Sequence, residues 1–223
     1  MPQSDADLLE TREGHAACVR TVKTYDRIAP IYDLLDAVYE HSWKRNLRRR
    51  VFEHAGESIL DVGVGTGCNM RFYPKGAAVV GIDSSRAMLE RAAERAVENG
   101  QQVQLLEMNL LDLGFENQRF DTVVATFVLL CLPDELQLAA LRELHRVLKP
   151  DGRLLILDYK MSERPGVRLA MRCIGPWLKW AFGGRYDAGT AHYVEEAGFQ
   201  TVGTQSFALD SVSLMILEPV RSD

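Results

Sequence analysis

A buried strand that runs directly into a glycine-rich turn is the feature that most constrains this chain. The apolar run Ile59–Val62 is followed by the pattern G-x-G-T-G. Glycine lets the backbone approach a ligand closely, because a side chain at Gly63 or Gly65 would block the approach. A helix is expected to begin near Asn69 and to offer its N-terminal N–H groups to a polar or negative ligand. The segment predicts a strand–loop–helix unit that binds a small molecule.

Two carboxylates accompany this loop. Asp61 directly precedes it, where a carboxylate would repel a pyrophosphate but suits a cationic ammonium or sulfonium group. Asp83 ends the next apolar run, about 20 residues further on, where a carboxylate can accept both hydroxyls of a ribose. The glycine spacing also differs from the dinucleotide fingerprint, in which the last glycine comes three residues after the second. The pattern predicts a nucleoside site rather than an NAD site, and the alternative is a tight strand–helix turn without a ligand.

Short apolar runs alternate with amphipathic segments between residues 56 and 160, and this alternation predicts βαβ units. Five parallel strands are expected, over Ser58–Val62, Ala78–Ile82, Val103–Met108, Asp121–Thr126 and Arg153–Asp158. Helices are expected over residues 84–99, with Ser84 or Ser85 as N-cap, and over residues 134–148, with Lys149–Gly152 as the stop. Phe199–Phe207 and Ser213–Leu217 have the spacing of an antiparallel hairpin at a sheet edge.

Composition and charge limit the possible partners. The 223 residues carry 26 Lys and Arg against 31 Asp and Glu, a net charge of −5, so no overall positive field exists to hold nucleic acid. The cysteines are scattered without a C-x-x-C pair, which disfavours a disulfide framework or a zinc site, and we expect no metal. Neither a signal peptide nor a membrane-spanning run is recognisable, so a cytoplasmic protein is expected. Residues 1–55 are predicted to form a helical cap on the same domain as the core, residues 56–223.

Three segments resemble the class I S-adenosylmethionine-dependent methyltransferases: Leu60–Gly67, Gly81–Leu89 and Arg146–Arg153. The resemblance covers residues 25–160. It implies an α/β, Rossmann-like sheet of seven mostly parallel strands, with helices on both faces and an antiparallel C-terminal hairpin. It also implies S-adenosylmethionine as the cofactor and S-adenosylhomocysteine as its product. The implied cofactor-binding residues are Asp61, Gly63, Gly65, Thr66, Gly67, Asn69, Asp83, Ser84, Met88, Asn109, Leu110, Thr126 and Phe127.

One of these positions departs from the family pattern. The family usually carries Gly-Asp-Ala after the third strand, and its Asp meets the adenine amino group, whereas this chain has Met108-Asn109-Leu110. Asn109 can still bond an adenine edge through either its amide oxygen or its amide nitrogen. After the fourth strand, Phe127 is expected to contact the methionine end of the cofactor, and the alternative is that it only fills the core.

The N-terminal segment points to the acceptor. Residues 25–33 resemble the Y-D-x-x-A-x-x-Y-D lid of quinone C-methyltransferases and of bacterial phosphatidylethanolamine N-methyltransferases. Tyr25 and Tyr32 lie seven residues apart, so on a helix they share a face and could close over the transferred methyl group. The alternative is an aromatic stripe that packs the segment on the sheet. The resemblance implies methylation of a phospholipid amine, with quinone C-methylation as an alternative.

A second likeness widens the choice of acceptor. Residues 69–74, Asn-Met-Arg-Phe-Tyr-Pro, are similar to a segment of membrane-associated thiol methyltransferases, which makes S-methylation of a small thiol or sulfide a further alternative. A nucleoside-binding module without activity is the alternative that is not an enzyme. Proton acceptors near the expected site are Asp158, Tyr159 and His192, although His192 could instead cap a helix.

Two segments combine basic and aromatic residues, a pattern that suits an anionic membrane surface. A peripheral position at the inner membrane face is therefore possible, and the alternative is a solvated helix face that covers the substrate pocket. The residues concerned are Lys44, Arg45, Arg48 and Arg49 in the first segment, and Arg168, Arg172, Trp177, Lys179 and Trp180 in the second.

Overall fold

The computed structural model describes residues 19, 21–29, 32, 44–182, 185 and 189–220, with side chains described for all of these except residues 177–182. Much of the predicted cap, including residues 1–18 and 33–43, lies outside the described residues. The described parts of the cap are helical over residues 21–29 and in α2 (Arg45–Phe52).

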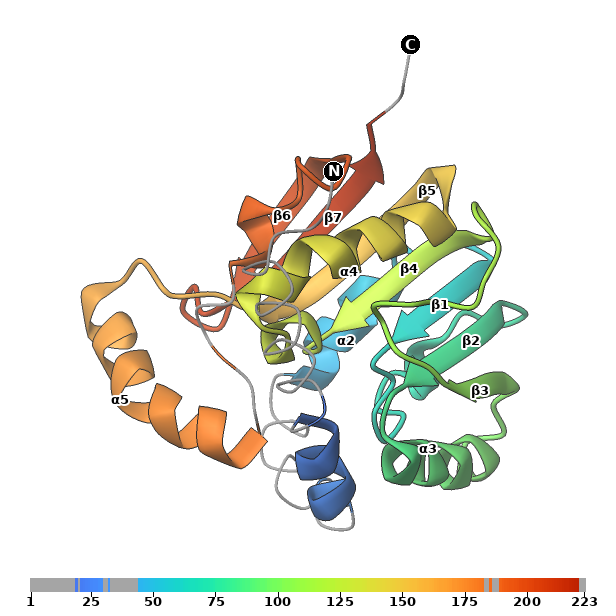
Figure 1. The fold of residues 1–223 in the computed structure, drawn as a ribbon, viewed down its shortest axis with the longest axis horizontal. Coiled ribbons are helices and arrows are strands. Elements are labelled where there is room, and N and C mark those ends of the chain that lie inside the picture. Colours follow the sequence, from blue (N-terminus) through green and yellow to red (C-terminus); the bar gives the residue numbers. More distant parts are fainter. Residues whose placement is uncertain are drawn as a thin grey trace, which may run out of the picture.

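A seven-stranded sheet forms the centre of the molecule (Figure 1). Its order is β3-β2-β1-β4-β5-β7-β6, and β7 is antiparallel to both of its neighbours, whereas the other pairs are parallel. The α/β, Rossmann-like architecture expected from the sequence is confirmed. The strands are β1 (Ser58–Val62), β2 (Ala78–Asp83), β3 (Val103–Glu107), β4 (Phe120–Thr126), β5 (Leu148–Tyr159), β6 (Phe199–Phe207) and β7 (Val212–Pro219).

Helices cover both faces because the central strands are apolar on both sides. Leu60 of β1 belongs to a core that includes Leu144 of α4 (Asp134–Val147). Ile59, its neighbour, belongs to a second core with Val51 of α2 and Ala92 of α3 (Arg86–Glu98). Alternate strand residues therefore fasten α4 to one face and α2 with α3 to the other.

Helix α3 begins and ends where its sequence predicts. The Ser85 hydroxyl accepts a hydrogen bond from the Met88 backbone N–H at 3.3 Å, which makes Ser85 the N-cap. The helix ends at Asn99, and Gly100 follows with φ +62°, the left-handed conformation that commonly terminates a helix.

The prediction of a helix that begins near Asn69 is wrong. Only a single 3-10 turn, η2 (Met70–Phe72), follows the glycine loop. The reason lies in Pro74, because a residue before proline avoids the helical region, and Tyr73 has ψ 134°. The loop therefore presents its own backbone to the site, without an α-helix N-terminus behind it.

Lys149–Gly152 was expected to separate a helix from a strand, but the structure includes these residues in β5. The pairing with β4 nevertheless skips them: Phe120 pairs with Leu148, and Thr122 pairs with Arg153. The four residues form a bulge, which interrupts the pairing of β5 with β4. No helix among the described residues is long and apolar enough to cross a membrane.

Candidate active site

A cavity of about 480 Å³ opens at the carboxyl ends of β1, β2 and β4. Ligands of open α/β sheets bind at this edge, where the strand order reverses. Most of the predicted site residues line it: Tyr25, Tyr32, Gly63, Gly65, Thr66, Asp83, Ser84, Met88, Asn109, Leu110, Thr126 and Phe127. Asp61, Gly67, Asn69, Asp158, Tyr159 and His192 are not among the lining residues.

The glycine loop forms the floor of the cavity. Gly63 has φ +63°, and a Cβ added there would lie 2.4 Å from Cγ2 of Val128, so no larger residue fits. Gly65 has φ +55° with only the Gly63 carbonyl oxygen near its own added Cβ, at 3.9 Å. Gly65 is therefore glycine for its backbone conformation and leaves the space above the loop open.

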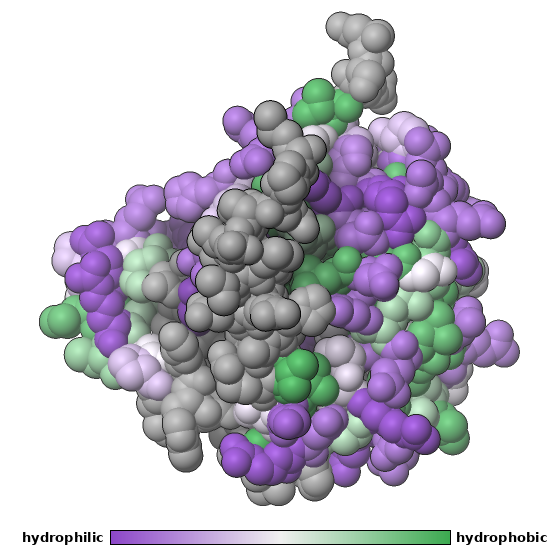
Figure 2. Space-filling view, viewed as in Figure 1, coloured by the Kyte–Doolittle hydropathy of each residue, from purple (hydrophilic) through white to green (hydrophobic). Residues whose placement is uncertain are grey.

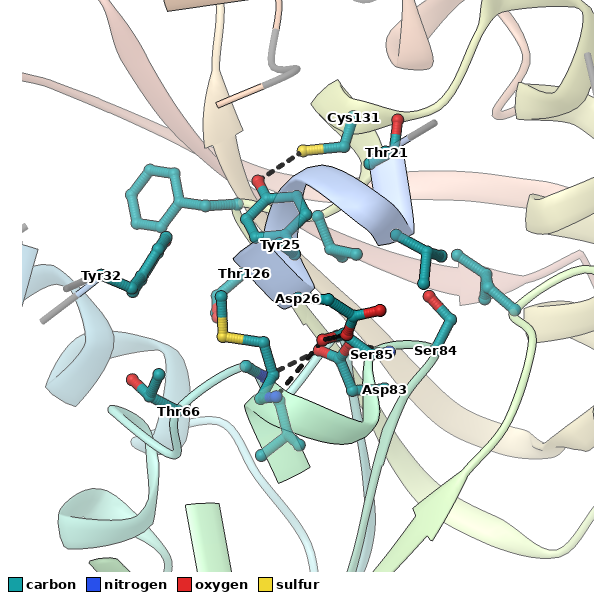
Figure 3. Close-up of a pocket in the computed structure, with 18 of the residues that line it drawn as sticks. Thr21, Tyr25, Asp26, Tyr32, Thr66, Asp83, Ser84, Ser85, Thr126 and Cys131 are labelled. Atoms are coloured by element: carbon teal, nitrogen blue, oxygen red, sulfur yellow. Dashed lines mark hydrogen bonds between the residues drawn. The ribbon is translucent and has the colours of Figure 1, made fainter. Parts of the chain in front are cut away.

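Asp83 connects β2 to this loop. Its Oδ2 accepts the Gly65 backbone N–H and its Oδ1 accepts the Ser85 backbone N–H, both at 2.9 Å. Burial raises the pKa of Asp83, and these two hydrogen bonds lower it in part. The Ser85 hydroxyl donates to Asp26 at 2.6 Å, so the N-terminal helix is fastened beside Asp83. Figure 3 shows Asp83, Asp26 and Ser85 gathered on one side of the cavity.

A buried polar network supports the loop from behind. The Asn69 amide nitrogen donates to both oxygens of Asp61, at 3.0 and 2.9 Å, and the Tyr73 hydroxyl donates to Asp61 at 2.7 Å. Burial raises the pKa of Asp61 to about 6, although its hydrogen bonds and Arg48 lower it. Asp61 was expected to face a cationic ligand, but it is fully buried and bonded to protein groups.

Arg48 joins this network to the cavity. Its Nη1 donates to Asn69 Oδ1 at 2.8 Å and to Thr126 Oγ1 at 2.9 Å, and the residue lines the cavity. Arg48 and Lys44 were expected to face a membrane, but both are only 7% exposed, whereas Arg45 and Arg49 are exposed. The basic segment is thus divided, with two cations turned inward and two turned outward.

Phe127 is held rigidly beside Arg48. It has φ 56°, an uncommon conformation for a residue other than glycine, and its backbone N–H donates to Leu157 at 2.8 Å. The Lys44 ammonium lies 5.0 Å and the Arg48 guanidinium 5.3 Å from its ring centroid, and the Tyr159 ring lies 5.2 Å away. Cations over an aromatic face are attracted by its quadrupole, so these contacts fix the ring at the cavity wall.

Two tyrosines line the same cavity from the N-terminal segment. The Tyr25 and Tyr32 ring centroids are 6.0 Å apart, and the Tyr25 hydroxyl lies 3.2 Å from Cys131 Sγ. Burial raises the pKa of the Tyr25 hydroxyl well above 10 and that of the Cys131 thiol to about 12. Both groups keep their protons at neutral pH. In Figure 3 these side chains lie apart from the Asp83 group.

The predicted proton acceptors are not brought into the cavity. Asp158 is buried, and its oxygens accept the backbone N–H groups of Leu130 at 3.0 Å and Tyr159 at 2.8 Å. Asp158 therefore positions the η3 turn (Leu129–Cys131), which leads into the cavity wall. Tyr159 is half-buried against Phe127, and His192 is exposed in η4 (Thr190–His192). No group of three or more His, Cys, Asp or Glu that could hold a metal occurs among the described residues.

The raised pKa of Asp158 predicts that the stability of the folded protein depends on pH. Burial raises its pKa from 3.8 to about 7, so its proton favours the folded state. That stabilisation is complete below the unfolded pKa and is lost as the pH rises through about 7. The midpoint of thermal unfolding should therefore fall between about pH 4 and 7 and level off above pH 7, and this fall should be smaller in Asp158→Asn.

Asp121→Asn is the matched control for this experiment. Asp121 pairs with Lys149, which lowers its pKa, so Asp121 does not titrate in the same window. The control should retain the dependence of the wild-type protein. An Asp158→Asn variant with the full wild-type fall would contradict the assignment.

The sequence interpretation missed Arg48 and Asp26 as parts of the site. A signal for Arg48 exists, because Leu47, Arg48, Val51 and Phe52 have the spacing of one helix face and all are buried. Asp26 is the first aspartate of the Y-D-x-x-A-x-x-Y-D pattern, but the sequence does not indicate its partner Ser85, which is 59 residues away in the chain.

Known proteins share this architecture. A family model described as a methyltransferase domain matches residues 59–152. A demethylmenaquinone methyltransferase from Tropheryma whipplei (strain Twist) is 34% identical over 175 residues, which cover 74% of this chain and 70% of that protein. A phosphatidylethanolamine N-methyltransferase from Cereibacter sphaeroides is 35% identical over 131 residues, 55% of this chain and 64% of that protein.

Solved structures show the same fold at lower identity. A SAM-dependent methyltransferase from Aquifex aeolicus has a TM-score of 0.60 at 22% identity, covering 78% of this chain and 88% of its own. The [4+2]-cyclase SpnF has a TM-score of 0.69 at 19% identity, covering 90% and 97%. The sheet and its glycine loop are therefore those of a methyltransferase fold. The chain belongs to the class I S-adenosylmethionine-dependent methyltransferases, as its sequence motifs indicated.

Proposed function

We propose that this enzyme transfers the methyl group of S-adenosylmethionine to the amine of a phospholipid. The observation that carries the proposal is the arrangement of one cavity, which has the Asp83 carboxylate and glycine loop in one part and the Tyr25 and Tyr32 rings in another. The first part suits a nucleoside, and the second suits an amine whose nitrogen becomes a permanent cation on full methylation.

The residues present fit the cofactor. Asp83 has a carboxylate at the end of β2 for the ribose hydroxyls, and Gly65 leaves room for the ribose to approach. The Asn109 Oδ1 already accepts the Leu111 backbone N–H at 3.0 Å, so we assign the amide nitrogen to an adenine ring nitrogen. Arg48 is a buried cation at the cavity wall, and we assign it to the carboxylate of the methionine part.

Bound S-adenosylmethionine supplies an electrophilic methyl group on a sulfonium. The chain has to align an acceptor with that carbon and exclude water. Tyr25 and Phe127 provide rigid aromatic surfaces for this purpose, and the Tyr25 hydroxyl keeps its proton, so it orients the acceptor without removing a proton. An ammonium acceptor has to lose its proton to solvent before it binds productively.

Quinone C-methylation is the second candidate. It is supported by the names of several relatives, including the demethylmenaquinone methyltransferase of Thermus thermophilus, 33% identical over 74% of this chain. S-methylation of a thiol rested on the likeness of residues 69–74 to thiol methyltransferases. Asn69 and Tyr73 of that segment are hydrogen-bond partners of buried Asp61, so the likeness does not favour a thiol acceptor.

Label transfer tests the proposal. Isotopically labelled S-adenosylmethionine is incubated with vesicles containing phosphatidylethanolamine, with demethylmenaquinol in detergent and with a small alkyl thiol, and the products are identified by mass. Label is expected in the phospholipid. Phosphatidylcholine vesicles, which offer no free amine, are the matched control and should stay unlabelled. Label only in the quinol or only in the thiol would overturn the phospholipid assignment.

A further inference from the structure

Helix α5 (Pro165–Phe182), like α2, carries basic residues without acidic ones. It contains Arg168, Arg172 and Lys179 and no Asp or Glu, in a chain whose net charge is −5. Figure 1 shows the helix standing apart from the sheet, beyond the layers formed by α2, α3 and α4. In Figure 2 hydrophilic and hydrophobic side chains lie side by side over this part of the molecule.

The first side of the helix faces inward. Met171 is 6% exposed and Val167, four residues earlier, is half-buried. Residues four apart share a helix face, so these two define the side that packs against the protein. Among residues 165–176, the part of α5 whose side chains are described, Leu169, Ala170, Arg172, Cys173 and Ile174 are exposed.

The second side is basic. Arg168 and Arg172 are four residues apart and share one face of the helix, which we call the basic stripe. Lys179 follows Arg172 by seven residues in the sequence, outside the residues with described side chains. Within the part of the chain that the structure describes, neither Arg168 nor Arg172 has an ion-pair partner. Arg168 and Arg172 therefore form a local positive surface that no ion pair among the described residues neutralises.

The third side is a broad apolar and exposed arc, because Leu169 and Ile174 are five residues apart and bound it at about 140° from each other around the helix. Leu169 is 64% and Ile174 49% exposed, and Cys173 between them is also exposed. The sequence continues with Trp177 and Trp180, which lie outside the residues with described side chains. Exposed aliphatic residues beside a basic stripe are typical of helices that lie in the plane of a membrane interface.

We propose that α5 docks the enzyme on an anionic phospholipid bilayer. Leu169 and Ile174 enter the boundary between headgroups and acyl chains, and Arg168 and Arg172 meet the lipid phosphates. As an account of how a lipid acceptor is reached, this inference rests on the proposed function. The docking itself requires only the helix.

The ends of α5 lead to the cavity. Before the helix, β5 ends at Tyr159, whose ring lies 5.2 Å from that of Phe127 in the cavity wall. After it, the Arg185 backbone N–H donates to the Leu130 carbonyl at 3.2 Å, next to Cys131. A bilayer bound by α5 therefore lies on the side of the molecule from which these two segments reach the tyrosine part of the cavity.

A second copy of the chain is a poorer occupant of this surface. In a two-fold dimer the same patch meets itself, so a contact that includes the basic stripe brings like charges together, and a contact through the apolar side leaves the stripe without a partner of opposite charge. An anionic bilayer satisfies the apolar side and the basic side at the same time.

Vesicle sedimentation of the full-length protein tests the docking. Vesicles of phosphatidylglycerol and phosphatidylethanolamine should bind the wild-type protein, and vesicles of phosphatidylcholine should bind it much more weakly. At about a factor of five per basic residue near the surface, the double variant Arg168→Gln, Arg172→Gln should bind about 30-fold more weakly. Its control, Arg86→Gln with Arg142→Gln, removes two exposed arginines elsewhere and should bind as the wild type does.

The apolar side has its own pair of variants. Leu169→Gln with Ile174→Gln should lose most of the binding, whereas Val97→Gln, at an 83% exposed valine of α3, should retain it. Wild-type protein that stays in the supernatant, or α5 variants that sediment like their controls, would overturn the docking. Circular dichroism verifies that each variant is folded.

Activity on a monomeric acceptor separates the two proposals. The α5 variants should methylate dihexanoylphosphatidylethanolamine below its micellar concentration at the wild-type rate, and should be slower only with vesicles. If the protein binds vesicles through α5 but methylates no phospholipid, the docking holds and the proposed function fails. If it methylates the monomeric lipid but binds no vesicle, the docking fails alone.

Discussion

Replacing Asp83 by alanine should weaken the binding of S-adenosylmethionine by about two to four orders of magnitude, as measured by isothermal titration calorimetry. Hydrogen bonds to a charged group contribute about 1.5 to 3 kcal/mol each, and the carboxylate is assigned to two ribose hydroxyls. The change also removes the acceptors of the Gly65 and Ser85 backbone N–H groups, which hold the loop and the start of α3 together.

Two further variants show whether the loss comes from the ribose. Asp83→Asn keeps one acceptor oxygen and should fall between alanine and the wild type. Glu107→Ala removes an exposed carboxylate at the end of the neighbouring strand β3, outside the cavity lining, and should alter the affinity little. An unchanged dissociation constant for Asp83→Ala would refute the assignment of this cavity to the nucleoside.

Replacing Arg48 by methionine should weaken the binding of S-adenosylhomocysteine by about 10- to 100-fold, the range for one charge-assisted hydrogen bond pair. Methionine keeps much of the apolar stem but removes the guanidinium that bonds Asn69 and Thr126. The loss should be confined to ligands that carry the amino-acid carboxylate. Binding of 5′-methylthioadenosine, which lacks that carboxylate, should change little.

Arg49→Met is the matched control, because Arg49 is in the same helix with its side chain exposed. It should bind both ligands as the wild type does. Equal weakening of both ligands by Arg48→Met would mean that Arg48 acts only by packing the loop, and the carboxylate assignment would then be abandoned.

The fold was predictable because its signals are local. Each central strand is a short apolar run, and the cap of α3 and its glycine stop are adjacent to the helix that they limit. The glycine loop is equally local, since its conformation depends on Gly63 and Gly65 themselves. The helix predicted after the glycine loop is replaced by η2, because Pro74 directly follows Tyr73 and disfavours the helical conformation there.

The candidate site was less predictable, because its polar side chains form hydrogen bonds with residues that are distant in the sequence. Asp61 and Asp158 are at strand ends, as expected of site residues, yet Asp61 is bonded by Asn69 and Asp158 by two backbone N–H groups. Sequence spacing places a residue at an edge of the sheet but does not state which partner its side chain meets. Lys44 and Arg48 show the same limit. They stand in a run of basic residues, but Arg48 lies on the buried face of α2 with Leu47 and Val51.

The two parts of the cavity come from different parts of the chain. Gly63, Asp83 and Thr126 belong to the continuous central stretch, whereas Tyr25 comes from the N-terminal segment and α5 interrupts the path from β5 to the final hairpin. Segments outside the central sheet can diverge without changing the strands that position the glycine loop. The acceptor can thus change during evolution while the cofactor-binding part of the cavity is kept. Two relatives of similar identity to this chain agree with this, because one is named for a quinone and the other for a phospholipid. Chimeras that exchange only the N-terminal segment between relatives should carry acceptor preference with it.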